Sequence, residues 1–153
     1  AFVEQHGLAV ALVGQPVHPR AAGVARLLVD VLDQLAAQEG ADIGMGHDAV
    51  ERHQQRIGAA LAQESGKSLD DAVAETGYGV ELMRYHAEWA RRVEGEVIES
   101  DTPDETLMLK RTPIGVVACL IPFNFPIYTL VRKIAPALIT GNAVVIRPSN
   151  NTR

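Results

Sequence analysis

One short loop toward the C-terminal end of the chain carries residue types that chemistry uses. Asn124 stands between Pro122 and Pro126, after the apolar run Gly115–Ile121 and before a stretch with helical character. The first proline biases Ile121 to extended geometry, and the second suits the first turn of a helix. The pattern predicts a rigid loop that holds Asn124 at the carboxyl end of a strand and beside a helix N-terminus. Open α/β sheets bind ligands at such positions, and free N–H groups there favour negative charge.

The side chain of Asn124 suits two different roles in this setting. Its amide can donate an N–H to an oxyanion that develops in a reaction, and loss of such a donor costs about 2.7–4 kcal/mol of transition-state stabilisation. It can equally cap the helix that follows, because Asn is among the preferred N-cap residues. The residue pattern by itself leaves both roles open.

Three amphipathic helices are predicted ahead of this loop. The first spans 21–39, the second runs from Asp48 as N-cap to Gly66, and the third from Ser68 to about Val93. Ser68-Leu69-Asp70-Asp71 resembles a capping box in which Asp replaces the usual Glu. The residues expected to face the core are Val50, Ile57, Leu61, Leu69, Ala72, Val80, Met83 and Trp89.

Polar residues of the helical region are interpreted without a catalytic or metal-binding role. The charged side chains of the third helix are expected to form a solvated face with i,i+3 and i,i+4 ion pairs. These residues are Glu75, Glu81, Arg84, Glu88, Arg91 and Arg92. The spacing of His47, His53 and His86 is unlike that of zinc ligands, so no metal site is expected.

After Gly95 the hydrophobic periodicity changes from that of a helix to two residues, the period of a β-strand. Strands are predicted over Glu96–Ser100 and Thr106–Arg111, joined as a hairpin. A βαβ unit follows, with two strands of the type that is buried on both faces. Its elements are Gly115–Ile121, Pro126–Thr140 and Ala143–Ile146. The expected fold class is therefore α/β: a helical N-terminal part, a β-hairpin and the start of a Rossmann-like βαβ unit. Residues 1–20 have no clear period and are expected to form an irregular arm.

Composition excludes several classes of function. A chain of 153 residues with 47% hydrophobic residues can bury a core. The net charge of −5 and the scattered Lys and Arg argue against nucleic acid as a partner. Apolar runs are too short for a membrane span, and the start lacks the basic region of a signal peptide. The single cysteine, Cys119, fits a cytoplasmic protein and, inside an apolar strand, is expected to be buried and inert.

Several motifs, in this order and spacing, resemble the aldehyde dehydrogenase superfamily. They are Pro113–Val117, Ile121–Pro126, Lys133–Leu138 and Thr140–Ser149, with Glu64–Lys67 and Ala87–Glu96 upstream. The motif at Ala87–Glu96 is similar to the lactaldehyde and glycolaldehyde dehydrogenase branch. The resemblance covers residues 48–153, which are expected to form part of a cofactor-binding domain. Residues 1–47 are expected to be a divergent N-terminal arm and helix.

The resemblance implies NAD(P)-dependent oxidation of an aldehyde, expected to be small and polar, to a carboxylic acid. Asn124 would hold the thiohemiacetal oxyanion. The residues that would contact the cofactor are Leu120, Ile121, Pro122, Phe123, Arg147, Ser149 and Asn150. The residues that would contact the aldehyde are Phe125 and Arg132. The alternative for Arg132, a structural residue that pairs with another segment, stays open.

Two departures from the family pattern leave the choice between NAD and NADP open. The family commonly has Lys and Glu where this chain has Arg147 and Asn150. Arg keeps the positive charge but presents a wider, planar group. Asn150 lacks the carboxylate that would repel a 2′-phosphate, while it can still bond a ribose hydroxyl.

The family's nucleophilic Cys and general-base Glu lie in regions that correspond to positions beyond 153. We therefore expect this chain to be the N-terminal fragment of a longer enzyme and to be inactive alone. The alternative is a truncated, catalytically inactive chain that acts at most as an interaction or structural fragment, pairing through the hairpin. Because the matching hairpin of the family lies at subunit contacts, the full-length protein is expected to be a homo-oligomer.

Overall fold

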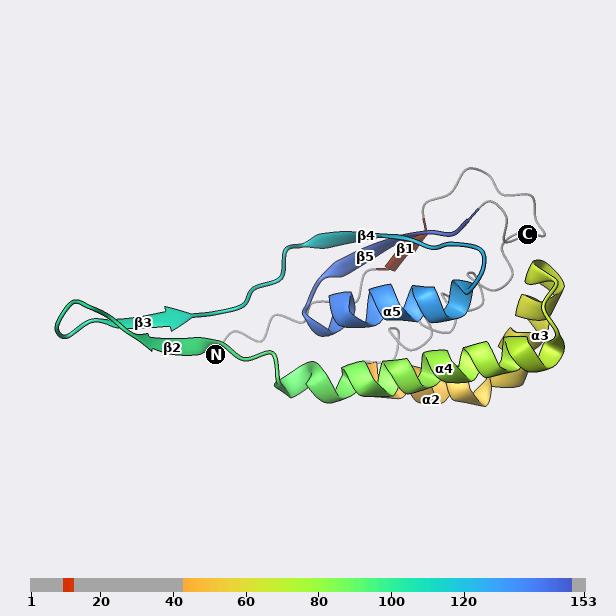
Figure 1. Ribbon diagram of the computed structural model, residues 1–153, viewed down its shortest axis with the longest axis horizontal. Helices are drawn as coiled ribbons and strands as arrows, with labels where there is room; N and C mark the ends of the chain where they lie inside the picture. The colour runs from red at the N-terminus through yellow and green to blue at the C-terminus, as the bar shows by residue number, and fades with distance from the viewer. Residues whose placement is uncertain (1–9, 13–42, 150–153) are drawn as a thin grey trace.

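The computed structural model of the protein describes residues 10–12 and 43–149, and the side chains of 47–149 (Figure 1). Its elements form layers: a parallel sheet, then α5 (Pro126–Ile139), then a group of helices on the far side of α5. A hairpin extends away from these layers. The helix predicted over 21–39 lies outside the described residues.

Two helices, α2 (Ile43–Arg52) and α3 (Gln54–Ser65), replace the single helix expected from Asp48 to Gly66. The chain leaves helical geometry at His53, where φ is −105° and ψ is 9°. The predicted C-terminal stop is correct, because Gly66 has a left-handed φ of 73° and closes α3. The prediction was wrong about the start and about continuity, since both Gly44 and Gly46 lie inside α2.

The third predicted helix is present as α4 (Leu69–Ala87), and a short 3₁₀ helix, η1 (Glu88–Arg91), continues it. Ser68 caps α4 as predicted, because its Oγ accepts the Asp71 N–H at 3.1 Å. A capping box does not form. Instead, the Asp71 carboxylate accepts a hydrogen bond from the Ser68 hydroxyl at 2.6 Å.

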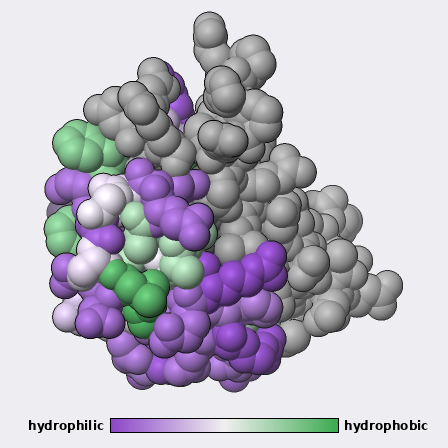
Figure 2. Space-filling model, turned by 90° about the vertical axis from the view of Figure 1, so that its right-hand side faces the viewer, coloured by the Kyte–Doolittle hydropathy of each residue, from purple (hydrophilic) through white to green (hydrophobic). Residues whose placement is uncertain are grey.

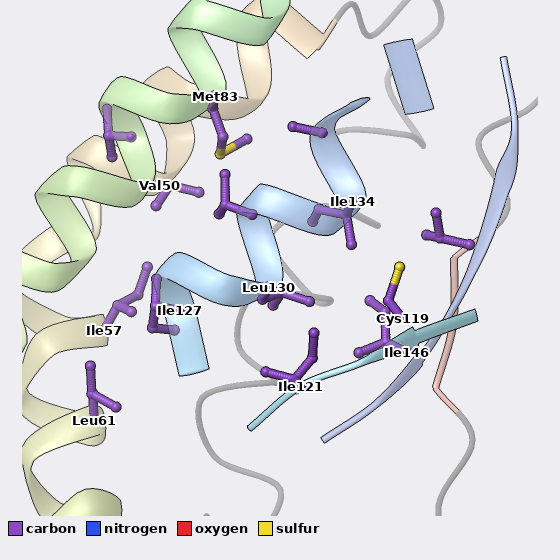
Figure 3. Packing of buried hydrophobic residues seen from close by; sticks show 14 of the residues in the cluster. Val50, Ile57, Leu61, Met83, Cys119, Ile121, Ile127, Leu130, Ile134 and Ile146 are labelled. Atoms are coloured by element: carbon purple, nitrogen blue, oxygen red, sulfur yellow. The ribbon is translucent and has the colours of Figure 1, made fainter. Parts of the chain in front are cut away.

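The core lies on both sides of α5 (Figure 3). Six of the predicted core residues are buried: Val50, Ile57, Leu61, Ala72, Val80 and Met83. Leu69 and Trp89 were predicted wrongly, with exposed fractions of 51% and 41%. Leu69 is the first residue of α4, at the end of the packed face. Trp89 lies in η1, where three residues per turn replace 3.6 and rotate the side chain off the apolar stripe.

The sheet has the order β1-β5-β4, and both pairings are parallel. The strands β4 (Val116–Leu120) and β5 (Ala143–Arg147) flank α5 in sequence, so the predicted βαβ unit is confirmed. The third strand, β1 (Val10–Leu12), lies in the segment expected to be irregular. Three residues are too few to show a period, and their partner strand lies at the other end of the chain.

The strand β4 is buried on one face only, whereas burial on both faces was expected. Cys119 is 1% exposed, but Val116 and Leu120 are 66% and 59% exposed. Side chains alternate between the two faces of a strand, and among the described helices α5 covers one face of this sheet (Figure 1). The apolar composition alone could not show that only one face of the strand is covered.

The predicted hairpin is confirmed as β2 (Glu96–Glu99) and β3 (Thr106–Leu109), which pair antiparallel with Glu96 opposite Leu109. It projects from the body of the molecule (Figure 1). Gly95 allows the strands to meet, because a Cβ there would lie 2.1 Å from the Leu109 carbonyl oxygen. Every residue of the two strands is exposed.

Apolar surface is unevenly distributed over the described residues. At the end of the molecule that carries α3, the described residues are mostly hydrophilic, with apolar groups near the middle of the view and along its left side (Figure 2). The hairpin and the segment that follows it carry highly exposed apolar residues, including Val97, Met108 and Ile114 at 70%, 81% and 85%. None of the described helices is long and apolar enough to cross a membrane.

Candidate functional site

Asn124 lies in the wall of a pocket between α4 and α5. The pocket has a volume of about 660 Å³. Its lining residues are Tyr78, Glu81, Leu82 and Tyr85 from α4, and Asn124, Phe125, Tyr128 and Thr129 from the loop and α5. Half of the lining residues are therefore aromatic, and Asn124 is one of the polar residues among the others.

Asn124 does not cap α5, although the sequence left that role open. The N-cap is Phe125, with φ of −137° and ψ of 65°, and no side chain bonds to the helix from that position. The side chain of Asn124 is exposed and makes no hydrogen bond within the part of the chain that the structure describes. Its N–H groups are therefore available to a molecule in the pocket.

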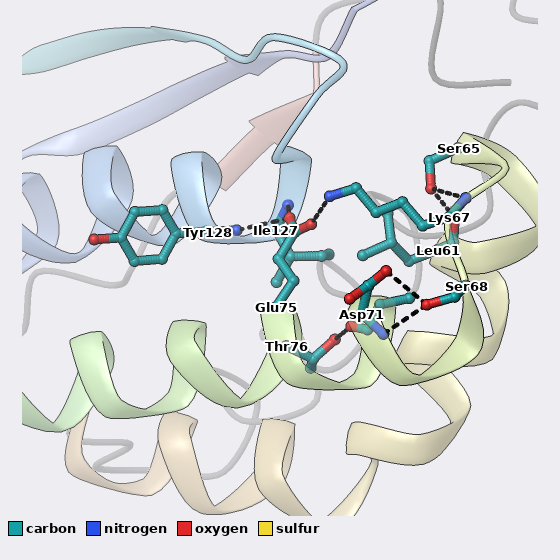
Figure 4. A network of polar contacts seen from close by, with 10 residues as sticks. Leu61, Ser65, Lys67, Ser68, Asp71, Glu75, Thr76, Ile127 and Tyr128 are labelled. Carbon is teal, nitrogen blue, oxygen red and sulfur yellow. Dashed lines mark hydrogen bonds and ion pairs between the residues drawn. The ribbon is translucent and has the colours of Figure 1, made fainter.

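The free amides at the start of α5 are occupied by Glu75 (Figure 4). Its side chain is 1% exposed, and Oε1 accepts the N–H of Ile127 at 2.9 Å and of Tyr128 at 3.3 Å. The prediction of a solvated Glu75 was therefore wrong. The prediction that this helix end offers free N–H groups to a negative ligand also needs correction, because the protein's own carboxylate already lies there.

The other charged residues of α4 and η1 are partly or fully exposed, as predicted. Arg84 forms the expected i,i+3 pair with Glu81 at 2.7 Å. It also bonds Glu51 of α2, and this hydrogen bond raises the pKa of Arg84. The carboxylate of Glu81, at the pocket, is thus partly neutralised by a neighbouring guanidinium.

Lys67 reaches the site from the turn between α3 and α4. Its ammonium pairs with Oε2 of Glu75 and lies 3.9 Å from the ring centroid of Phe125. The turn is fixed by the left-handed Gly66 and by the Oγ of Ser65, which accepts the Lys67 N–H at 3.4 Å. The Lys67 ammonium therefore contacts both the buried carboxylate of Glu75 and the ring of Phe125, the residue after Asn124.

The residues expected to contact a cofactor lie where β4 and β5 end. Leu120 is opposite Arg147 in the parallel ladder, and the N–H of Ile121 donates to the Arg147 carbonyl at 3.0 Å. The carbonyl of Leu120 accepts from Nζ of Lys133. Leu120, Phe123 and Arg147 are all exposed.

The ends of β4 and β5 lie side by side at one edge of the sheet. Neighbouring parallel strands finish side by side with exposed residues, which is where open α/β sheets bind dinucleotides. Pro122 is also exposed and Ser149 is half-buried. Asn150 lies outside the described residues.

The two residues expected to contact the aldehyde lie at different distances from the pocket. Phe125 lines it and is 49% exposed. Arg132 is exposed and does not line it. It follows Tyr128 by four residues, so it lies one turn farther along the same face of α5.

Cys119 is 1% exposed inside β4. Burial raises the pKa of its thiol, and the nearby Lys133 only partly opposes this effect. A thiol that is neutral and inaccessible is a poor nucleophile. The expected burial of Cys119 is therefore confirmed.

The sequence analysis missed Lys67, Glu75 and the tyrosines of the pocket. One signal could have identified Glu75: it lies three residues after Ala72 and four before Gly79, on the apolar stripe of the helix. A carboxylate on a buried face needs partners, and their identity could not be read from the local pattern.

The family model and the curated relatives that match this chain indicate the same family. Residues 21–153 match the family described as the aldehyde dehydrogenase family. Lactaldehyde dehydrogenase of Escherichia coli (strain K12) is 45% identical over 96 residues, which are 63% of this chain and 20% of that protein. D-glyceraldehyde dehydrogenase (NADP(+)) of Thermoplasma acidophilum is 36% identical over 105 residues, 69% of this chain and 21% of that protein.

The solved structures give the same result. The crystal structure of an NAD-dependent benzaldehyde dehydrogenase from Corynebacterium glutamicum matches with a TM-score of 0.70 and 31% identity. That match covers 87% of this chain and 29% of the other. The chain spans about a fifth of the length of the curated relatives it matches.

Proposed function

This chain belongs to the aldehyde dehydrogenase family, and from that premise we propose that it is the N-terminal part of an NAD(P)-dependent enzyme that oxidises a small polar aldehyde to a carboxylic acid. One observation carries the proposal: Asn124, whose side chain has no hydrogen-bond partner among the described residues, lines a pocket between α4 and α5 and follows the end of the parallel strand β4 by four residues. An aldehyde oxygen gains negative charge when a nucleophile attacks its carbon. An N–H donor set for that charge stabilises the transition state by about 2.7–4 kcal/mol.

The exposed ends of β4 and β5 are the proposed cofactor site. A bound NAD(P)+ would supply the acceptor for the hydride that leaves the aldehyde carbon. The guanidinium of Arg147 can donate to ribose or phosphate oxygens from this edge. Matching relatives include an NAD-dependent and an NADP(+) enzyme. Because Asn150 lacks a carboxylate that would repel a 2′-phosphate, Asn150→Glu should lower the kcat/KM for NADP+ relative to that for NAD+.

The proposed substrate is a short aldehyde with a hydroxyl or carboxylate near the carbonyl. The hydroxyls of Tyr78, Tyr85 and Tyr128 offer hydrogen bonds in an otherwise aromatic pocket. Arg132 forms no ion pair among the described residues and lies one turn beyond the pocket. Two matched relatives, named for lactaldehyde and D-glyceraldehyde, support a substrate of this class.

The test is aldehyde-dependent reduction of NAD+ and NADP+ by the full-length protein, with lactaldehyde, glycolaldehyde and propanal as substrates. We expect turnover with the hydroxyaldehydes and a roughly 100- to 1,000-fold lower kcat in Asn124→Ala. Absence of turnover with every aldehyde would contradict the proposal. A reading frame that continues into a cysteine-containing segment supports it, whereas a stop codon directly after Arg153 favours a non-enzymatic fragment.

A second proposal concerns assembly through the hairpin. An isolated two-stranded hairpin is marginally stable in water, and this one exposes apolar side chains on two strands that, among the described elements, pack extensively only against each other. The apolar residues are Val97, Ile98, Leu107, Met108 and Leu109. We propose that they pack against another subunit in a homo-oligomer. Light scattering of the full-length protein tests this, because a monomer in solution would contradict it.

A further inference from the structure

The buried carboxylate of Glu75 in α4 pairs with Lys67 in the turn before α4 and accepts hydrogen bonds from the first turn of α5 (Figure 4). Among the described residues, Glu75 is the only charged side chain that is buried. A buried carboxylate is tolerated when every oxygen has a donor. Here the donors are the backbone N–H groups of Ile127 and Tyr128 and the ammonium of Lys67.

The carboxylate completes the hydrogen bonding at the start of α5. Pro126 has no N–H, and the N–H of Thr129 makes the first regular helical bond, to the Phe125 carbonyl at 2.9 Å. The two remaining amides, of Ile127 and Tyr128, both donate to Glu75. Glu75 thus takes the donors that an N-cap side chain would otherwise bind.

Asn124 is the residue that would compete for those donors. An Asn three residues before Ile127 stands at the spacing at which an N-cap side chain accepts an N–H from the helix. Such self-capping would turn the side-chain amide of Asn124 onto α5. Glu75 already occupies both amides, and the Asn124 side chain, which lines the pocket, has no hydrogen-bond partner among the described residues.

The loop around Asn124 is held on both sides. Before it, the N–H of Ile121 is bonded to the Arg147 carbonyl on β5. After it, the ring of Phe125 lies against the same Lys67 ammonium that pairs with Glu75. Lys67 therefore contacts both Glu75, which binds the start of α5, and the loop that carries Asn124.

We propose that Lys67 and Glu75 are positioning residues, which keep the Asn124 amide directed into the pocket by occupying the amides that it would otherwise cap. The catalytic consequence rests on the proposed function. A catalytic group displaced by about 1 Å can lose on the order of 100-fold in rate. Neither side chain touches the pocket itself, so both act through the loop.

The kinetic test is a double-mutant cycle in the full-length enzyme. Glu75→Ala is expected to lower kcat by roughly 30- to 100-fold, with little change in the KM for NAD(P)+. Glu75→Gln keeps an acceptor for the two amides and should retain most of the activity. In an Asn124→Ala background, Glu75→Ala should cause no further loss, because the group that it positions is gone.

The matched control is Thr76→Val on the same helix. Thr76 is 0% exposed and bonds only the Ala72 carbonyl of its own helix, at 3.0 Å, so its loss perturbs α4 without freeing the α5 amides. We expect an unchanged kcat. If Glu75→Ala lowers kcat by the same factor with and without Asn124, the positioning role is refuted. Where Glu75→Ala does not fold, Glu75→Met, which fills the same space without an acceptor for the two amides, takes its place with the same expectations.

A second measurement needs no catalysis. Hydrogen exchange of a peptide over residues 124–130 should accelerate about tenfold in Glu75→Ala, and more in the double variant with Asn124→Ala, which cannot cap the freed amides. Equal exchange in Glu75→Ala and the wild type would overturn the proposal. If the full-length protein oxidises no aldehyde, the proposed function fails, and hydrogen exchange alone then decides whether Glu75 controls Asn124.

Discussion

Two asparagines at opposite ends of α5 should respond in opposite ways to replacement by alanine. Asn142 makes four hydrogen bonds: Oδ1 accepts from the N–H groups of Ile114 and Gly115, and Nδ2 donates to Ala137 and Thr140. Asn124 makes none with the described residues. We predict that Asn142→Ala lowers stability and that Asn124→Ala lowers activity.

The magnitudes follow from these contacts. Each hydrogen bond of Asn142 contributes about 0.5–1.5 kcal/mol net, and water can replace part of this because the site is partly exposed. We expect Asn142→Ala to cost about 2–3 kcal/mol of unfolding free energy. Asn124→Ala should stay within about 0.5 kcal/mol of the wild type, as exposed substitutions usually do. Its kcat should fall roughly 100- to 1,000-fold, equivalent to about 2.7–4 kcal/mol.

Urea unfolding and steady-state kinetics on the full-length variants measure both effects. The expected pattern is a shifted midpoint with near-normal kcat for Asn142→Ala, and the reverse for Asn124→Ala. An Asn124→Ala protein with lowered stability would show that this Asn is a structural residue. An unchanged kcat in a stable Asn124→Ala protein would refute the oxyanion role.

Three further predictions concern other parts of the chain. The 153-residue chain alone should not oxidise aldehydes, and turnover that Cys119→Ser abolishes would contradict this. Cys119 should react with iodoacetamide only after unfolding, because its burial and raised pKa disfavour the thiolate. Arg132→Leu should raise the KM for glycolaldehyde and lactaldehyde more than for propanal, and an equal loss for all three would make Arg132 structural. Met108→Asp should dissociate the oligomer, whereas Glu99→Gln, also on the hairpin, should not. Light scattering of both variants measures this. An intact oligomer in Met108→Asp would exclude the hairpin as its interface.

Local patterns in the sequence were sufficient for much of the fold. The caps at Ser68 and Gly66, and the individual strands and helix of the hairpin and the βαβ unit, depend on residues within a few positions of one another. The loop around Asn124 was also predicted from its neighbouring prolines. In each case periodicity or backbone restriction acts over one or two turns, so the chain segment itself contains the necessary information.

Tertiary structure decided the features that depend on distant partners. β1 is a strand because β5 lies beside it, and three residues show no pattern of their own. Glu75 resembles the solvated carboxylates around it until α5 brings the amides of Ile127 and Tyr128 to its side chain, 52 and 53 residues along the chain. That contact also leaves Asn124 no amide of Ile127 or Tyr128 to cap, because a side chain caps a helix only where the helix amides are free. Competition for those donors is a property of the packed structure, and no local sequence pattern contains it.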